Sequence, residues 1–400
     1  MFTRRYFLRC SAIALAGLGT APSWLVRAAA QTGHTANKRK ILVVIFQRGA
    51  ADGLNVVVPF FEKLYYDMRP TIAVPLPGQE NGGIDLDGHF ALHPSLRSLK
   101  PLWDRSQLAI IHAAGSPDPT RSHFDAQDYM ESGTPGKTSE DGWLNRALEP
   151  EPVASPLRAI AIGAQLPRTL RGNHQAVAVN NVQQFETRNK ELAGILENMY
   201  ASTTDPRLMA SGKETFEAVK IIESINRSPY APANGAQYQG GFGNALQQVA
   251  HLIKADAGVE AAFVDIGGWD HHVNEGPQLT NLLREFGASL AAFTYDLGDR
   301  MEDIVLVTMS EFGRTAREDG NAGTDHGHGN VMMVVGGPVR GGRVYGRWPG
   351  LEPEQLYEGR DLAVTTDFRD VLGELVSRHL ARDVTQVFPG YKIGTPLGLI

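Results

Sequence analysis

The chain has almost no cysteine. Its single cysteine, Cys10, lies in an N-terminal segment that we expect to be removed from the mature protein. A mature chain without cysteine forms no disulfide bond, offers no thiolate to a metal ion and has no thiol nucleophile. Any metal ion must therefore be bound by histidine and carboxylate side chains. Any nucleophile must be a serine, a threonine or a water molecule.

The sequence also lacks an excess of positive charge. The formal net charge is −6, and residues 1–30 contain four arginines and no acidic residue, so their removal takes the charge to −10. Such a surface favours neither nucleic acid nor an anionic membrane as a partner. No segment is apolar over a length that would span a bilayer, so we expect no stable membrane anchor. The composition of the 400 residues, 42% hydrophobic and 20% charged, is ordinary for a globular protein, and we predict a single domain over 31–400.

Residues 1–30 predict an export signal. They contain the twin-arginine pattern T-R-R-Y-F-L-R, then a run rich in Ala, Leu and Gly, and finally A-A-A. This order predicts a twin-arginine signal peptide that is cleaved after Ala30. The alternative is a membrane anchor, which is disfavoured because the apolar run is short and is broken by Gly17 and Pro22. We therefore expect the twin-arginine export machinery as a partner and a periplasmic or secreted location.

Several short apolar runs predict strands that are buried on both faces. They cover residues 40–46, 108–113, 259–266, 304–309 and 331–335. Residues 278–297 carry apolar side chains at helical spacing between two of these runs. Strand, helix and strand in this order form a βαβ unit, so we predict an α/β fold with a doubly wound, mostly parallel sheet. Residues 137–250 differ in character, and we predict that they form an insertion or lid over the sheet.

Polar residues follow the apolar runs at the points where the strands should end. They are Asp52, Arg121 with Ser122, Asp270 with His272, and Glu311 with Asp325, His326 and His328. Because parallel strands place their carboxyl ends at one edge of the sheet, we expect these groups to converge. Carboxylate and imidazole ligands without sulfur suit Zn, Mn, Mg or Ca. We predict one or two such divalent ions, bound by residues from the set Asp52, Asp270, His272, Glu311, Asp325, His326 and His328.

Ser122 has three possible roles on sequence grounds. A serine directly before an amphipathic run is typical of a helix N-cap, and here the run begins at His123. A helix N-terminus also binds anions, so Ser122 could instead be a nucleophile facing a bound phosphate or sulfate. In the third possibility a metal hydroxide attacks the substrate, and Ser122 only caps the helix.

Five motifs resemble a known family. They are R-G-A-A-D-G-L-N at 48–55, S-H-F-D-A-Q-D-Y-M-E-S-G at 122–133, G-W-D-H-H at 268–272, S-E-F-G-R-T at 310–315 and G-T-D-H-G-H-G-N at 323–330. In this order they resemble the bacterial secreted proteins labelled domain of unknown function 1501. The resemblance covers nearly the whole mature chain. That family in turn looks like a distant branch of the alkaline phosphatase and sulfatase superfamily.

The resemblance to the superfamily implies an alkaline-phosphatase-like fold and roles for individual residues. Asp52 matches the first metal-binding Asp, and Ser122 falls near the nucleophile. Asp270 and His272 match one metal-binding pair, Glu311 matches the Asp of the superfamily's S-D-H-G motif, and His326 or His328 matches the last His. Phe312 departs from the pattern, because it stands where the superfamily usually has a His ligand.

Together these observations predict an exported metal-dependent hydrolase of phosphate or sulfate esters that acts on a small anionic ester. Ser122 or a metal hydroxide would attack, and Arg121 or Arg314 would stabilise the developing oxyanion. The alternative, supported by Phe312, is an exported binding or assembly protein that retains the fold without the chemistry.

Overall fold

The computed structural model describes residues 39–136, 139–150, 155–182, 197–204, 206–227 and 229–400. The predicted signal peptide lies outside these residues, as does most of the segment 183–200. Residues Lys40–Ile400 form one compact unit. Within the described residues, none of the helices is both long and apolar enough to cross a membrane.

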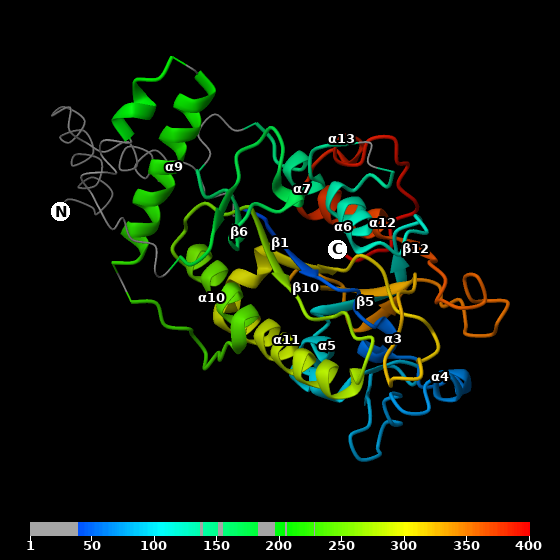
Figure 1. Cartoon of the computed structure of the whole chain (residues 1–400). Coiled ribbons are helices and arrows are strands. Elements are labelled where there is room, and N and C mark those ends of the chain that lie inside the picture. The colour runs from blue at the N-terminus through cyan, green and yellow to red at the C-terminus, as the bar shows by residue number, and fades with distance from the viewer. Residues whose placement is uncertain (1–38, 137–138, 151–154, 183–196, 205, 228) are drawn as a thin grey trace. The chain divides into compact units, whose positions relative to one another are not determined.

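A nine-stranded sheet forms the centre of this unit (Figure 1). Its order is β11 (Arg343–Tyr345), β5 (Leu108–Gly115), β10 (Asn330–Gly336), β9 (Ile304–Met309), β1 (Ile41–Gln47), β8 (Ala261–Ile266), β6 (Ala159–Ile162) and β7 (Val177–Val179), with β12 (Thr366–Asp367) beside β5. Only β10 runs against the others, and it pairs antiparallel with both β5 and β9. The predicted mostly parallel sheet is confirmed.

Strand β1 shows why these apolar runs form strands that are buried on both sides. All seven of its residues are buried, and Val44 pairs in parallel register with Phe263 of β8 and Val307 of β9. Successive side chains of a strand point to opposite faces. Accordingly, Val43 belongs to one hydrophobic core and Val44 to another. Each face therefore needs its own helical layer, which is the doubly wound arrangement that the sequence predicts.

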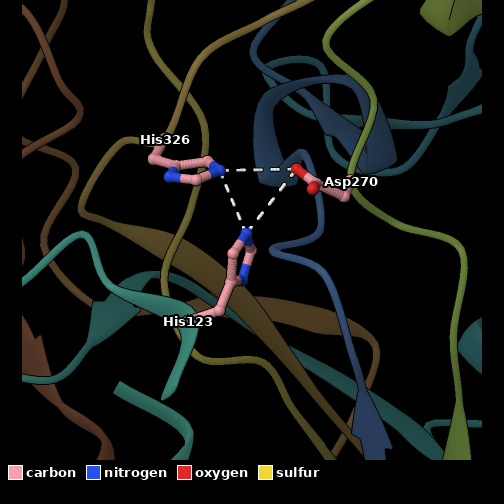
Figure 2. Close-up of side chains that lie close together, drawn as sticks. All are labelled: His123, Asp270 and His326. Atoms are coloured by element: carbon pink, nitrogen blue, oxygen red, sulfur yellow. Dashed lines mark hydrogen bonds and ion pairs between the residues drawn. The ribbon is translucent and has the colours of Figure 1, made fainter. Parts of the chain in front are cut away.

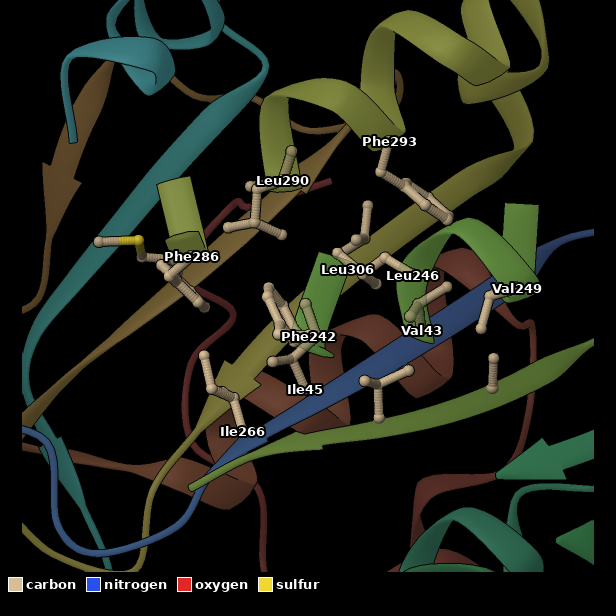
Figure 3. Packing of buried hydrophobic residues seen from close by; sticks show 14 of the residues in the cluster. Val43, Ile45, Phe242, Leu246, Val249, Ile266, Phe286, Leu290, Phe293 and Leu306 are labelled. Atoms are coloured by element: carbon tan, nitrogen blue, oxygen red, sulfur yellow. The ribbon is translucent and has the colours of Figure 1, made fainter. Parts of the chain in front are cut away.

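Two long helices cover one face of the sheet. Figure 3 shows α10 (Gly240–Lys254) and α11 (Glu275–Leu297) lying over β1 and β9. Leu246 of the first helix and Leu290 of the second are fully buried and pack in the same core as Ile45. The opposite core lies beneath α7 (Trp143–Arg146), α12 (Phe368–Glu374) and α13 (Val384–Val387), and α6 (His123–Ser132) lies on the same side (Figure 1).

Further strands and helices belong to the described structure. A three-stranded sheet has the order β2 (Val57–Val58), β4 (Ala91–Leu92) and β3 (Ile84–Asp85). The remaining helices are α3 (Gly53–Val56), α4 (Lys63–Met68), α5 (Lys100–Asp104) and α9 (Pro206–Ile225), 3-10 turns at Pro94–Leu99, Arg168–Leu170 and Gly298–Asp303, and a π turn at Leu375–His379.

The structure differs from the insertion or lid that the sequence predicts over 137–250. Within this range β6 pairs in parallel with β8, and β7 pairs with β6, so both strands extend the central sheet. Helix α10 belongs to the layer that covers the sheet. Residues 229–239, which the sequence suggests as part of a lid, are fastened to α11, because Tyr230 and Tyr238 both donate hydrogen bonds to the buried Asp296 carboxylate. Strands β6 and β7 and helix α10 are therefore parts of the central layers rather than additions above the sheet.

Candidate metal centre

Three imidazoles and one carboxylate meet at the carboxyl edge of the sheet. The Nε2 atom of His326 lies 3.0 Å from that of His123 and 3.1 Å from that of His272. It also lies 3.4 Å from Oδ1 of Asp270. That oxygen is 2.9 Å from Nε2 of His272 and 3.6 Å from Nε2 of His123. We call these four residues the His/Asp cluster; Figure 2 shows three of them, His123, Asp270 and His326, pointing at one another.

The topology of the sheet brings the cluster together. His123 is the first residue of α6, which follows β5. Asp270 and His272 lie in the loop after β8, and His326 lies in the loop from β9 to β10. Strands β5, β8 and β9 run in one direction, so these segments begin at the same edge. Convergence at this edge is what the sequence predicts.

Close backbone approaches hold the loops in place. Gly49, after β1, has φ +119°, and a Cβ atom there would lie 2.7 Å from the backbone nitrogen of Asp270. Only glycine fits such a position without strain. In the His326 loop, the Gly313 N–H donates to the His328 carbonyl and the Thr315 N–H donates to the Asp325 carbonyl. The position of the His326 backbone is therefore fixed by the segment that follows β9.

The far nitrogens of two imidazoles are occupied by hydrogen bonds. Nδ1 of His123 lies 2.9 Å from the Glu311 carboxylate, and Nδ1 of His326 lies 3.1 Å from the carbonyl of Arg121. Both acceptors require N–H at Nδ1, which leaves a lone pair on each Nε2 in the neutral rings. These two lone pairs face each other across 3.0 Å. They repel unless a proton or a cation lies between them, so the arrangement fits a metal ion.

The dimensions and donors of the cluster fit the same interpretation. Zinc binds histidine nitrogen and carboxylate oxygen at about 2.0–2.2 Å, usually as a tetrahedron, whose ligand atoms then lie about 3.3–3.5 Å apart. The donor separations in the cluster range from 2.9 to 3.6 Å. His123, Asp270 and His326, and separately His272, Asp325 and His326, form groups whose ligand atoms lie within 4.8 Å of one another. Asp270 and His272 are 48% and 40% exposed, so one side of the cluster is open to solvent.

The surroundings shift the pKa values of the cluster residues in different directions. The hydrogen bond to Glu311 raises the pKa of His123 and outweighs burial. Burial lowers the pKa of His326, and the neighbouring His123 lowers it further. Burial alone would raise the pKa of Asp270, but the hydrogen bond and charge of Arg314, together with the neighbouring His272 and His123, outweigh it and hold the pKa below its usual value. Neutral imidazole and ionised carboxylate are the forms that bind metal.

Arg314 supports Asp270 from inside the protein. Its side chain is fully buried, and Nη2 donates to Asp270 Oδ1 at 2.5 Å. The remaining N–H groups donate to backbone carbonyls of Gly49, Ala50, Trp269 and Thr324. Because its donors are committed within the protein, Arg314 is placed to orient Asp270. The structure does not place it as the predicted clamp for a substrate oxyanion.

Asp52 lies apart from the cluster. Its carboxylate accepts two hydrogen bonds from Arg69, at 2.5 and 3.0 Å, and both side chains are buried. Arg69 also donates to the carbonyls of Thr315 and Ala316, in the loop that leads to His326. Among the described residues, Asp52 belongs to none of the groups that could hold a metal ion. Asp52 follows the end of β1, as the sequence predicts, but the guanidinium of Arg69 already neutralises the charge of its carboxylate.

Glu311 and Asp325 border the cluster without joining its centre. The buried Glu311 carboxylate contacts Nδ1 of His123, the nitrogen that faces away from the cluster. Asp325 is exposed, pairs with Arg360 at 2.8 Å and lies 4.0 Å from Nδ1 of His272. Of the predicted metal ligands, the structure thus groups Asp270, His272 and His326 most tightly, with Asp325 at the rim.

Two aromatic contacts explain the roles of His328 and Phe312. His328 is buried and stacks on Tyr357, with 4.5 Å between ring centroids, so it points away from the cluster. Phe312 is buried, and its ring centroid lies 5.0 Å from that of His123 and 5.1 Å from that of His326. The position at which the superfamily usually carries a ligand therefore holds an apolar support behind two imidazoles.

His123 is the member of the cluster that sequence reasoning missed. It directly follows Ser122, and a serine before a helix is the more familiar signal for a cap or a nucleophile. The available signal was a histidine in the first turn of a helix that follows a buried strand, because that turn lies at the same sheet edge as the other loops. Arg121, the other neighbour, forms ion pairs with Glu358 and Asp361 and is not free to bind an anion.

Ser122 is the N-cap of α6. Its backbone is extended, with φ −84° and ψ 117°, and its hydroxyl accepts a hydrogen bond from the Asp125 N–H at 3.4 Å. The predicted cap is therefore present, and the hydroxyl is directed at the helix backbone.

We expect Ser122→Ala to lower the free energy of unfolding by about 1 kcal/mol, the usual effect of losing a cap, and to leave any ester-hydrolysing activity within a few-fold of native. Ser122→Asp, which restores a cap, should recover the stability. Denaturant unfolding and steady-state kinetics of both variants test this. A loss of turnover by orders of magnitude in both, with native stability in the aspartate variant, would instead identify Ser122 as the nucleophile.

Comparison with known proteins agrees with the motifs. The chain belongs to the family described as "Protein of unknown function (DUF1501)", whose model matches residues 39–386. No curated protein is significantly similar in sequence.

Several solved structures have a similar arrangement. The C-terminal periplasmic domain of EcEptC from Escherichia coli is 11% identical, with a TM-score of 0.37 and 90% of each chain covered. The alkaline phosphatase from the Antarctic bacterium TAB5 is 10% identical, with a TM-score of 0.32, 88% of this chain and 99% of that chain covered. At this degree of likeness neither protein bears on the chemistry of the cluster.

Proposed function

We propose that the protein is an exported, metal-dependent hydrolase of phosphate or sulfate esters. The observation that carries the proposal is the His/Asp cluster, in which the lone pairs of His123 and His326 face one point beside Asp270. The five sequence motifs resemble those of a family that looks like a distant branch of the alkaline phosphatase and sulfatase superfamily, and this resemblance supports the choice of ester. The twin-arginine pattern supports export to the periplasm or beyond.

The donor set favours one divalent ion rather than two. His123, Asp270 and His326 would hold it, and His272 would lie beside it. Two further carboxylates that a second ion would need, Asp52 and Glu311, are committed to partners within the protein. A bound divalent ion would supply Lewis-acid activation for hydrolysis. The residues of the chain hold its ligands in orientation: Arg314 fixes Asp270, and the carbonyl of Arg121 fixes His326.

The exposed side of the cluster would receive the substrate. Asp270 and His272 line that side, and Asp325 borders it. Because the cluster is open, an ester with a bulky group on the far side of the scissile bond can approach it without rearrangement of the fold.

A second candidate is an exported binding protein without catalysis. The specific observation in its favour is that the three residues predicted to attack the substrate or stabilise its charge already have partners. The Ser122 hydroxyl caps a helix, Arg121 is paired with Asp361, and Arg314 is buried with its N–H groups engaged.

Metal analysis separates these candidates. We expect the purified mature protein to contain about one divalent ion per chain, and dialysis against a chelator to abolish hydrolysis of aryl phosphates or aryl sulfates until metal is restored. Elemental analysis and a panel of phosphate monoesters, phosphate diesters and sulfate esters provide the measurements. Bound metal without turnover of any ester would favour the binding protein. Absence of both metal and turnover would exclude the hydrolase.

A further inference from the structure

Glu311 is a buried carboxylate placed behind a metal ligand. Its Oε1 atom lies 2.9 Å from Nδ1 of His123, and the Glu311 side chain is fully buried. From this contact we infer that Glu311 is a positioning residue, which fixes the tautomer and orientation of His123 and thereby tunes the metal site without binding the ion. The inference rests on the proposed metal site.

The surroundings of Glu311 hold its carboxylate firmly. Besides His123, Oε1 accepts hydrogen bonds from the Gly49 N–H at 2.8 Å and from Nε2 of Gln127 at 2.9 Å. Oε2 lies 3.0 Å from the Ser310 hydroxyl. Three donors around one oxygen leave it little capacity for a cation. The carboxylate is thus used within the protein, although it stands where the superfamily has a metal ligand.

The same network joins the segments that carry the cluster. Gln127 lies on α6, one turn after His123, and its side-chain oxygen accepts a hydrogen bond from Arg48 at 2.9 Å. Arg48 also pairs with Glu131 of α6 and Asp265 of β8. Glu311 therefore connects the end of β9 with the loop after β1 and with the helix that presents His123.

Such a contact has a known physical effect. A histidine that donates its far N–H to a carboxylate has one ring nitrogen committed, so the other is available to the metal, and its basicity rises. Phe312 packs against the His123 ring and restricts its rotation from the other side. Loss of a partner of this kind typically weakens metal binding by about 10- to 100-fold.

The test compares Glu311→Gln with Glu131→Gln in the mature protein. Glutamine keeps the shape of Glu311 and can still accept the His123 N–H, but it removes the charge. Glu131 belongs to the same network and accepts hydrogen bonds from Thr169, not from a histidine, which makes it the matched control. Zinc affinity is measured by competition with a chromogenic chelator, and ligand geometry by the visible spectrum of the cobalt(II)-substituted protein.

We expect Glu311→Gln to raise the zinc Kd by about 10- to 100-fold with an unchanged cobalt spectrum, Glu311→Ala to raise it further, and Glu131→Gln to leave it within about twofold. An unchanged Kd in Glu311→Gln would overturn the inference. So would a changed cobalt spectrum, which would make Glu311 a direct ligand.

A measurement without metal separates this inference from the proposed function. In metal-free protein, nitrogen-15 NMR of the histidine rings should show His123 with its proton on Nδ1 in the native chain, and Glu311→Gln should reduce that preference. A native chain that shows this tautomer but binds no zinc would contradict the proposed function alone. A native chain without the tautomer would contradict the role of Glu311, whether or not zinc binds.

Discussion

Replacing His326 with alanine is expected to remove tight metal binding. His326 is the centre of the cluster, since its Nε2 atom lies within 3.4 Å of the donor atoms of His123, His272 and Asp270. Zinc at a structural site gains about 10–16 kcal/mol, or about 3–5 kcal/mol for each of the three proposed ligands if shared evenly. The zinc Kd should therefore rise by about 100- to 5,000-fold, and the proposed metal-dependent hydrolysis should fall with it at low free metal. Calorimetric or competition titration measures the affinity.

His328→Ala is the matched control, because it removes the other histidine of the same G-T-D-H-G-H-G-N motif. His328 stacks on Tyr357 and has no contact with the cluster. We expect its loss to cost about 1 kcal/mol of stability and to change the zinc Kd little. Equal losses of affinity in the two variants would contradict the arrangement of this loop, and native affinity in His326→Ala would exclude the cluster as the metal site.

Asp52→Asn is expected to lower the free energy of unfolding by about 3–5 kcal/mol at neutral pH. The substitution leaves the guanidinium of Arg69 buried without a counter-charge, because Asp52 supplies the carboxylate that contacts it. Burial alone would raise the pKa of Asp52, but the charge and hydrogen bonds of Arg69, together with Glu275 and Arg314, outweigh it and the pKa is lowered. A lowered pKa means that this stabilisation is present above the unfolded value of about 3.9 and is lost as the pH falls through the lower folded value.

The native protein and Asp52→Asn should therefore differ most in free energy of unfolding at pH 7, and this difference should decrease only at acidic pH. Urea unfolding at a series of pH values measures it. Glu275→Gln is the control, since Glu275 lies in the same buried network and bonds to Asn55 and Thr324. Burial raises the pKa of Glu275 well above its usual value, which favours the uncharged carboxyl, so an amide of the same shape should cost less stability than Asp52→Asn. Similar stability in native and Asp52→Asn would mean that the ion pair contributes nothing.

The strands and the edge that carries the cluster were predictable because each depends on a local pattern. A run such as Ile304–Met309 is apolar at every position except Thr308, and parallel topology then determines which ends of the strands meet. Helix α6 was predictable in the same way, from the serine before its first turn, and it begins at the predicted residue, His123. These features require no knowledge of which distant side chain each residue contacts.

The choice of ligands depends on such distant contacts. The sequence context of Asp52 is that of a metal ligand. In the fold, however, Arg69, 17 positions later at the end of α4, contacts the Asp52 carboxylate. His326 and His328 are two residues apart, and only the course of the loop directs one into the cluster and the other onto Tyr357. Strands β6 and β7 were hard to place for another reason. They have four and three residues, too few for their pattern to distinguish a sheet edge from an insertion.

The separation of the ligands along the chain has a consequence for how the protein acquires metal. His123 and Asp270 are 147 positions apart, and His326 follows 56 positions later. An unfolded chain does not hold such groups together, so an ion bound as proposed selects the folded state. At a free concentration 100 times the Kd it adds about 2.7 kcal/mol to the stability of that state. The metal concentration in the compartment where the chain folds would then determine the folded fraction, and with it how much protein survives proteolysis, independently of any substrate.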